Sequence, residues 1–299
     1  MKRLAEFILQ GLPQAVAVAA GFAILSLLLP PLGFVSSAAI GLVALKVGFR
    51  QAIYVSLISS ALLAVVVIGM GQPGAVGVLS GLAQWLPLAA LGALLGRTGS
   101  WSLVMQSVFL VGVLAVVLLY ALFPGVDQFW LQTMQAFLQP VLEQAGTEGK
   151  PPTLNLEAIA PLITGMLVSA LILTSLLALM MARSMQARVE NPGGFAKEFE
   201  ELRTGVWPAG LSILFIGMAT FIGTSWANAL ASVAMVVFLI QGFALLHGIA
   251  ARMGWPKSSL IGLYVLLVIL LTPVVVIMAG IGIVDAFADF RRRLSGPAR

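Results

Sequence analysis

The sequence predicts an all-α, polytopic integral membrane protein, a helical bundle of about eight or nine spans. Of its 299 residues, 60% are hydrophobic and 9% are charged, and the mean hydropathy is +1.07. A soluble domain carries roughly a quarter charged residues, so a soluble fold is excluded. Lipid offers no hydrogen bonds to the backbone, and apolar runs of this length therefore predict helices.

Nine apolar segments follow one another along the chain. A helix needs about 20 residues to cross a hydrocarbon core of roughly 30 Å. The predicted segments are 9–29, 34–48, 51–71, 75–96, 101–123, 157–183, 205–222, 226–251 and 258–290. The second is short for a span, and the last would be roughly 50 Å long as one straight helix.

Basic residues in the short connections predict the orientation, because Lys and Arg concentrate on the cytoplasmic side of membrane proteins. A cytoplasmic N-terminus places nine of them on that side. These are Lys2, Arg3, Lys46, Arg50, Arg97, Arg183, Arg188, Lys197 and Arg203. The opposite side then holds the mostly acidic segment 124–157. A bacterial inner membrane protein with a cytoplasmic N-terminus fits this asymmetry.

The C-terminal third breaks the asymmetry. Three further crossings after residue 203 would place the arginines at 291–293 on the outer side. An even number of crossings avoids this, so either segment 205–222 does not cross or segment 258–290 folds back near Pro273. The sequence does not choose between these two alternatives.

Two further segments are amphipathic. In 126–145, apolar residues at helical spacing oppose a face of glutamines, which predicts a helix in the outer interface with Trp130 at headgroup depth. This helix either seals the bundle or covers a ligand pocket. Segment 184–204 turns at 191–194 and then places its apolar residues on one face. It either rests on the membrane surface or docks a partner.

These features divide the chain into three parts. Residues 1–183 form a transmembrane core that includes the outer amphipathic helix 126–145. Residues 184–204 form a cytoplasmic amphipathic linker, and residues 205–299 form C-terminal transmembrane helices with a basic tail.

Several kinds of chemistry are disfavoured by composition and spacing. The chain has no cysteine and one histidine, His247, so we expect no metal site and no cofactor. Ser225 and His247 would lie about 33 Å apart on one helix, too far for a serine protease pair. Intramembrane aspartyl proteases carry a glycine directly before the aspartate, whereas Val284 precedes Asp285 in this chain. Basic residues are scattered, which argues against nucleic acid. We expect no enzyme.

Neutral polar residues within the spans are the remaining candidates for a ligand site. Gln84 and Trp85 lie in the middle of a predicted span beside Pro87, which frees a backbone carbonyl. An amide and a carbonyl at this depth can line a cavity. The amide can equally form a hydrogen bond with a neighbouring helix.

The first span carries alanines at intervals of four residues, at Ala15, Ala19 and Ala23. Small residues at this spacing let a second helix approach closely. The ladder therefore serves either internal packing or contact with another membrane subunit.

The C-terminal residues carry a resemblance. The run QGFALLH at 241–247 and the later run GIVDAFADFR at 282–291 resemble the YybS-like family of uncharacterised bacterial membrane proteins. The residues of this family motif are Gln241, His247, Asp285, Asp289 and Arg291. The order of the first six spans is also similar to the S components of energy-coupling-factor vitamin transporters.

The resemblance to S components implies an outward-opening pocket for a small hydrophobic or vitamin-like ligand. Gln84 and Trp85 would lie in a span that lines this pocket, and the alanine ladder would dock a coupling subunit. Three extra apolar segments follow the sixth span, which departs from that pattern. No ATP-binding motif is present, so any energy for transport would come from a partner chain.

The leading hypothesis is a non-enzymatic membrane protein, in contact with membrane lipid, that binds a small molecule or a partner subunit. The alternative is a structural or regulatory scaffold whose working surface is segment 184–204.

The stretch IGIVDAFADFRRRL at 281–294 adds a structural prediction. Arg292 and Arg293 follow Asp289 at helical spacing, so this end is predicted to be a charged membrane boundary. Asp285 needs a partner elsewhere, and Arg252 or Lys257 qualify if the last segment folds back.

Overall fold

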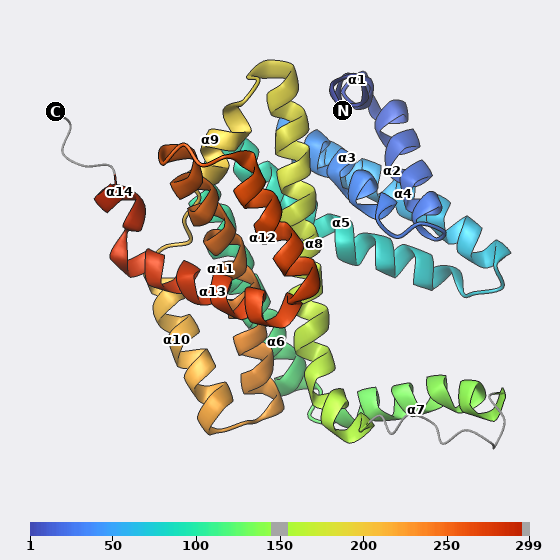
Figure 1. The fold of residues 1–299 in the computed structure, drawn as a ribbon. Coiled ribbons are helices and arrows are strands. Elements are labelled where there is room, and N and C mark those ends of the chain that lie inside the picture. The colour runs from blue at the N-terminus through green and yellow to red at the C-terminus, as the bar shows by residue number, and fades with distance from the viewer. Residues whose placement is uncertain (145–154, 295–299) are drawn as a thin grey trace.

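The computed structural model describes residues 1–144 and 155–294, and the described chain is helical without any strand (Figure 1). The helices are α1 (Lys2–Ile8), α2 (Leu12–Ser26), α3 (Leu32–Lys46), α4 (Phe49–Gly69), α5 (Gly74–Thr98), α6 (Trp101–Leu122), α7 (Val126–Gln144), α8 (Leu156–Glu190), α9 (Gly194–Glu200), α10 (Val206–Phe221), α11 (Ser225–Arg252), α12 (Lys257–Ile269), α13 (Leu271–Ala288) and α14 (Phe290–Leu294). Residue 145 of the predicted amphipathic helix and residues 295–299 of the predicted basic tail lie outside the described residues.

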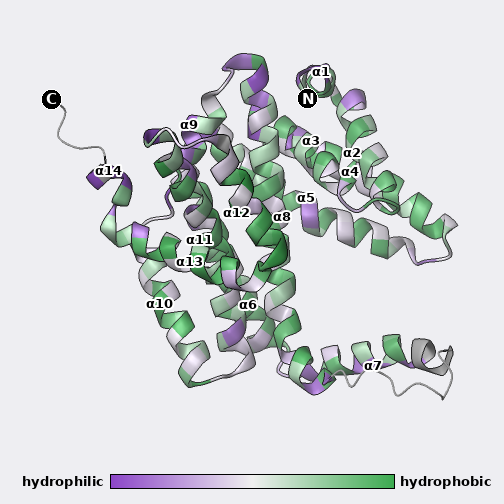
Figure 2. Cartoon of the chain, in the orientation of Figure 1, coloured by the Kyte–Doolittle hydropathy of each residue, from purple (hydrophilic) through white to green (hydrophobic). Residues whose placement is uncertain are grey.

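Six helices of the described chain, α4, α5, α6, α8, α11 and α13, are long and apolar enough to cross a membrane. Four further apolar helices, α2, α3, α10 and α12, are shorter. Figure 2 shows hydrophobic residues along the helices and hydrophilic residues gathered near helix ends and in α7. The chain is therefore a membrane protein with several transmembrane helices. Three of the nine predicted segments, 9–29, 34–48 and 205–222, correspond to helices that are short for a full span, and the last, 258–290, is divided into α12 and α13.

The helices form two groups that share α8 (Figure 1). In the first group, α3 lies among α2, α4, α5 and α8, and its residues 36–45 are all buried. In the second group, α11 lies among α6, α8, α10 and α13. Glycines permit the close contacts. A Cβ on Gly96 would lie 2.5 Å from the carbonyl oxygen of Leu45, and small residues are common where membrane helices meet.

Segment 258–290 is divided into two helices, α12 and α13, close to the point where one of the two alternatives predicted a fold-back. The helix breaks at Leu270, whose φ and ψ are −121° and 54°, three residues before the predicted bend at Pro273. Pro273 instead lies in the first turn of α13, where its missing N–H costs no helical hydrogen bond. The two helices are about 20 and 27 Å long.

After the break at Leu270, α13 crosses α11, with Met278 and Gly282 against Gly242 and Phe238, and leads to α14 beside the end of α11. There, the Arg252 side chain at the end of α11 donates a hydrogen bond to the carbonyl oxygen of Arg291 in α14. Lys46, Arg183 and Arg203 lie at the same end, where ion pairs link Lys46 to Glu190 in α8 and Arg183 to Glu198 in α9. We call this end of the bundle the basic end.

The predicted linker 184–204 packs one face against the bundle. Its first residues continue α8 as far as Glu190. In α9, the ring of Phe195 lies 6.2 Å from that of Trp101, and the ring of Phe199 lies 5.4 Å from that of His247. Leu202 is buried. The apolar face of this segment is therefore covered by helix ends of the same chain.

The amphipathic α7 lies at the opposite end of α8 from α9 (Figure 1). The indole nitrogen of Trp130 donates to the hydroxyl of Thr164 in α8 at 2.9 Å, and Tyr120 in α6 donates to Asp127 at 3.2 Å. These bonds fasten α7 to the bundle. They favour the role of a connecting helix.

Candidate functional site

A cavity of about 290 Å³ lies in the first group of helices, and we call it the Gln84 cavity. Its walls come from α2, α3, α4, α5, α8 and the connection between α2 and α3. Most of the lining is apolar. The polar side chains in the lining are Ser26, Ser36, Ser37, Ser80, Gln84 and Thr174, and the aromatic ones are Phe34 and Trp85. Both predicted ligand residues, Gln84 and Trp85, therefore border the same space.

The amide oxygen of Gln84 is held only weakly by the protein. Its partner, the hydroxyl of Thr174, lies 3.3 Å away. The same hydroxyl lies 2.8 Å from the backbone carbonyl of Ala170. A hydroxyl has one proton to donate, and the shorter bond is the stronger one. The amide of Gln84 can therefore turn toward a molecule in the cavity at little cost.

Gly81, one helical turn before Trp85, shapes the wall of the cavity. A Cβ at this position would lie 3.0 Å from the indole of Trp85 and 2.7 Å from the hydroxyl oxygen of Ser60. Trp85 is 3% exposed, and the buried Ser60 hydroxyl has no hydrogen-bond partner among the described residues. The missing side chain at Gly81 makes room for both groups beside the cavity.

The backbone carbonyl freed by Pro87 does not belong to this cavity. Pro87 and Ala83, whose carbonyl loses its helical partner, line a different and almost wholly apolar cavity of about 550 Å³ between α5, α6 and α8. The sequence analysis placed the amide of Gln84 and the carbonyl freed by Pro87 at one cavity. In the structure, Gln84 and Pro87 line different cavities.

The alanine ladder lies inside the bundle. Ala15, Ala19 and Ala23 are buried, and α2 packs on α3 and α4. Ser36 in α3 donates its hydroxyl proton to the carbonyl oxygen of Ala19 at 2.6 Å. Of the two alternatives for this ladder, the structure favours internal packing.

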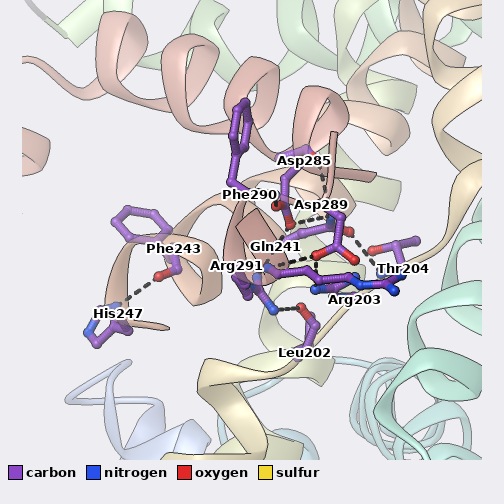
Figure 3. Close-up of polar contacts among 12 residues, drawn as sticks. Leu202, Arg203, Thr204, Gln241, Phe243, His247, Asp285, Asp289, Phe290 and Arg291 are labelled. Carbon is purple, nitrogen blue, oxygen red and sulfur yellow. Dashed lines mark hydrogen bonds and ion pairs between the residues drawn. The ribbon is translucent and has the colours of Figure 1, made fainter. Parts of the chain in front are cut away.

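A second polar site, at the basic end, brings together four of the five residues of the predicted C-terminal motif (Figure 3). Gln241, Asp285 and Arg291 are each exposed by 1% or less. The amide nitrogen of Gln241 donates to the carbonyl oxygen of Gly282 at 3.0 Å and to Asp285 Oδ2 at 3.3 Å. Its amide oxygen accepts from the backbone N–H of Thr204 at 2.8 Å. One side chain thereby joins α11, α13 and the connection before α10.

The structure pairs Asp285 with Arg291. Of the two predicted candidates, Arg252 donates to the carbonyl oxygen of Arg291, and the side chain of Lys257 lies outside the described residues. The guanidinium Nη2 of Arg291 lies 3.6 Å from Asp285 Oδ2, and its Nη1 donates to the carbonyl oxygen of Leu202 at 2.9 Å. The prediction that the arginines only mark a membrane boundary is therefore wrong for Arg291, which is buried in the bundle.

The backbone turn at Asp289 makes this pairing possible. On a continuous helix, two residues six positions apart lie about 9 Å apart along the axis and point about 120° apart around it. Asp289 adopts the left-handed conformation, with φ 47° and ψ 57°, and ends α13. The chain then redirects Arg291 toward Asp285, whose Oδ1 also accepts from the backbone N–H of Phe290 at 3.2 Å.

Asp289 itself forms an ion pair with Arg203, which precedes α10 (Figure 3). The prediction named Arg292 and Arg293 as its local partners. The Asp289 carboxylate accepts from the backbone N–H of Arg292 at 3.2 Å, and the backbone N–H of Arg293 donates to the Asp289 carbonyl oxygen at 3.3 Å. The hydrogen bond from Arg203 lowers the pKa of Asp289 from 3.8 to about 2. The same bond raises the pKa of Arg203. Both charges are therefore stabilised at neutral pH.

His247, the fifth motif residue, lies outside this cluster (Figure 3). Its Nδ1 donates to the carbonyl oxygen of Phe243 at 2.8 Å, because a carbonyl only accepts. Its Nε2 then accepts from the hydroxyl of Tyr264 in α12 at 3.2 Å. His247 therefore links α11 to α12.

Two glycines of the C-terminal runs set the distance between α11 and α13. A Cβ on Gly242 would lie 2.0 Å from the carbonyl oxygen of Met278, and one on Gly282 would lie 2.2 Å from that of Phe238. The backbones are in direct contact at this crossing. Without that contact, Gln241 could not reach Asp285 and Gly282 at once.

The sequence did not identify several members of these two sites. Ser37 and Thr174 of the cavity, and Leu202 and Thr204 of the cluster, were missed. Small hydroxyl residues in apolar spans are common, and Leu202 acts through its backbone carbonyl. Neither a common hydroxyl residue nor a backbone carbonyl marks a site in the sequence.

The fold and its sites define a polytopic, all-helical membrane protein with polar groups enclosed in each half. No group of His, Cys, Asp or Glu able to hold a metal ion occurs in the part of the chain that the structure describes. The chain belongs to the family described as predicted membrane protein (DUF2232), whose model matches residues 17–286. The match includes the Gln84 cavity and Asp285. No curated protein and no solved structure gives a significant match.

Proposed function

We propose that this protein binds a small, largely apolar molecule in the Gln84 cavity, without chemical conversion. One observation supports this most strongly, namely the grouping of a few polar side chains in the lining of an otherwise apolar cavity of about 290 Å³. Small-molecule sites are commonly concave and apolar, with a few polar groups that fix orientation, and their volumes start at about 300 Å³. Trp85 and Phe34 offer flat apolar contacts, while Gln84 and the serines offer hydrogen bonds.

The site belongs, in this proposal, to a bacterial inner membrane protein whose basic end is cytoplasmic. The positive-inside tendency supports this orientation, because the lysines and arginines gather at that end. A role in transport would follow the resemblance to S components. Because the sequence has no ATP-binding motif, such a role requires an energy-supplying partner chain.

The proposal is tested on the full chain extracted from its native membranes. Native mass spectrometry compares the mass of the purified protein with and without harsh activation, which releases a bound small molecule. We expect a released molecule from the natural sequence, and about fivefold weaker retention in Gln84→Ala, the loss expected for one hydrogen bond.

Gln132→Ala is the matched control, because Gln132 is exposed on α7 and contributes nothing to the cavity. It should retain the molecule as the natural sequence does. Absence of any bound molecule in the natural sequence, or equal retention in the two variants, would count against the proposal.

The competing function is a scaffold that acts through segment 184–204. The inward packing of Phe195 and Phe199 supports it less, because that apolar face is already occupied. Lys197, on the exposed side of α9, separates the two functions. If the protein is a scaffold, Lys197→Glu should impair its function and Gln84→Ala should not. If it is a ligand-binding protein, Gln84→Ala should impair its function and Lys197→Glu should not.

A further inference from the structure

The polar side chains of the Gln84 cavity differ in whether the protein already uses their protons. Four hydroxyls of the lining donate to backbone carbonyl oxygens: Ser26 to Ala23 at 2.6 Å, Ser36 to Ala19 at 2.6 Å, Ser80 to Gly77 at 3.3 Å and Thr174 to Ala170 at 2.8 Å. A hydroxyl has one proton and two lone pairs. These four groups are therefore left to a ligand as acceptors.

Three other side chains of the lining carry N–H or O–H groups that donate to no acceptor among the described residues, namely Gln84, Trp85 and Ser37. The hydrogen bond of Gln84 is made by its oxygen, which accepts from Thr174. If the amide is turned over so that its nitrogen faces Thr174, one of its two N–H groups still remains. The cavity therefore offers donors from neighbouring positions of α5.

The unused donors of Trp85 and Ser37 lie on buried side chains. Trp85 is 3% exposed and Ser37 is 5% exposed. Among the described residues, the polar atoms that are sealed off without a partner include the hydroxyl of Ser60 but neither of these two groups, so both are accessible. A buried donor without an acceptor costs free energy, and an acceptor on a ligand would recover it.

The lining of the cavity is uncharged. Among the described residues that form it, none is Asp, Glu, Lys, Arg or His. The backbone N–H groups of Gly33 and Phe34, which also border the space, donate to the carbonyl oxygens of Pro30 and Pro31 at 3.0 and 3.2 Å. An ionised group in such a space would lose its hydration without gaining a charged partner. The cavity therefore favours a neutral ligand.

The cavity opens at the connection between α2 and α3, where the lining residues Leu27 and Pro30 are exposed. Both are apolar. The length of α3, about 22 Å for its 15 residues, separates this connection from Lys46 at the basic end. The entrance therefore suits an apolar molecule and lies away from the charged end of the bundle.

Resting on the function proposed above, we infer that the ligand of the Gln84 cavity is a neutral carbonyl compound built on a flat apolar ring, as in the quinones. Its carbonyl oxygens accept from the unused N–H groups of Gln84 and Trp85. Its ring packs against the aromatic side chains of the lining, Phe34 and Trp85. Binding alone is inferred, with no bond made or broken.

The test compares two probes of similar shape: naphthoquinone, which has two carbonyl oxygens, and naphthalene, which has none. Isothermal titration calorimetry measures the binding of each to the full chain in a neutral detergent, with the titration into detergent alone subtracted. The chain has no cysteine, so no thiol can react with the quinone. We expect naphthoquinone to bind the natural sequence at least about fivefold more tightly, the gain expected for one hydrogen bond.

Gln84→Leu and Trp85→Phe each remove one donor and keep an apolar side chain in its place. Each should weaken the binding of naphthoquinone by about fivefold and leave that of naphthalene nearly unchanged. Gln132→Ala is the matched control, because Gln132 is exposed on α7 and does not line the cavity. A melting curve establishes that each variant is folded, and either donor variant tests the inference if the other folds poorly.

The outcomes separate this inference from the proposed function. Equal binding of the two probes, or an equal effect of Gln84→Leu on both, would overturn the ligand class and leave binding in the cavity standing. If naphthoquinone does not bind, the molecule released from the protein of native membranes decides. A neutral carbonyl compound supports the class, and a charged compound or one without a carbonyl group overturns it. If no molecule is released and neither probe binds, the proposed function fails, and this inference fails with it.

Discussion

The buried ion pair at the C-terminal end yields the sharpest stability prediction. Asp285→Asn keeps the shape of the side chain and removes its charge, which leaves Arg291 buried without its carboxylate partner at 3.6 Å. In the natural protein, the two carboxylate oxygens of Asp285 accept from Gln241 Nε2 at 3.3 Å and from the backbone N–H of Phe290 at 3.2 Å. The Asn side chain has one acceptor oxygen, so one of these two hydrogen bonds is lost. Removing one partner of a buried pair costs about 3–5 kcal/mol. We expect a loss of this size in the free energy of unfolding.

The assay is unfolding of the detergent-solubilised protein by a denaturing detergent, followed by tryptophan fluorescence. The double variant Asp285→Asn with Arg291→Met should recover part of the loss, because the stranded charge is removed as well. Arg293→Met, on the exposed side of α14, should be nearly neutral. The reasoning is refuted if Asp285→Asn lowers the free energy of unfolding by less than about 1 kcal/mol, a typical value for any substitution. The stretch at 281–294 would then be only a membrane boundary.

Two further predictions concern the same end of the molecule. Gly242→Ala places a Cβ 2.0 Å from the carbonyl oxygen of Met278 and should destabilise the protein by about 1–3 kcal/mol. Gly217→Ala in α10 has no atom within 4 Å of its Cβ, and the same unfolding assay should find it neutral or slightly stabilised. The pKa of Asp289 is lowered in the folded protein from 3.8 to about 2, so its ion pair with Arg203 stabilises the fold fully above pH 3.8 and is lost as the pH falls through 2. Asn also tolerates the left-handed backbone at this position, so the melting temperatures of the natural sequence and Asp289→Asn should converge over that interval, and a constant difference would contradict the assignment.

Composition and charge predicted the class of fold and most helix positions. Predicted segments 101–123 and 226–251 correspond to α6 and α11 within one or two residues. These spans have clear ends, since Gly, Ser or Arg flank an apolar run. The charge pattern also predicted a break within segment 258–290 as one of two alternatives, and the chain does break there, between α12 and α13.

The break at Leu270 could not be located from the sequence. Residues 265–272 are almost all apolar, so neither periodicity nor a polar residue marks the point where the helix ends. Pro273 was the residue that suggested a bend, but proline is equally compatible with the first turn of the next helix. The break lets α13 pack on α11. This packing depends on Gly242 and Gly282, which are 40 residues apart in the chain.

The candidate sites were predictable only in part. Gln84 and Trp85 stood out as large polar or amphipathic side chains in an apolar span, and both border the cavity. The partner of Asp285 was missed because sequence reasoning assumed one continuous helix through Asp289. A non-glycine residue in the left-handed conformation is uncommon, and its consequence, the pairing with Arg291, is visible only in the structure.

A density map of the protein purified from its native membranes tests the central claim most directly. Ligand binding in the first group of helices predicts non-protein density in the Gln84 cavity, in contact with the amide of Gln84 and the ring of Trp85. The same density should weaken in Gln84→Ala and persist in Gln132→Ala. A cavity that is empty in the natural sequence, with the Gln84 amide settled against Thr174, would contradict the account.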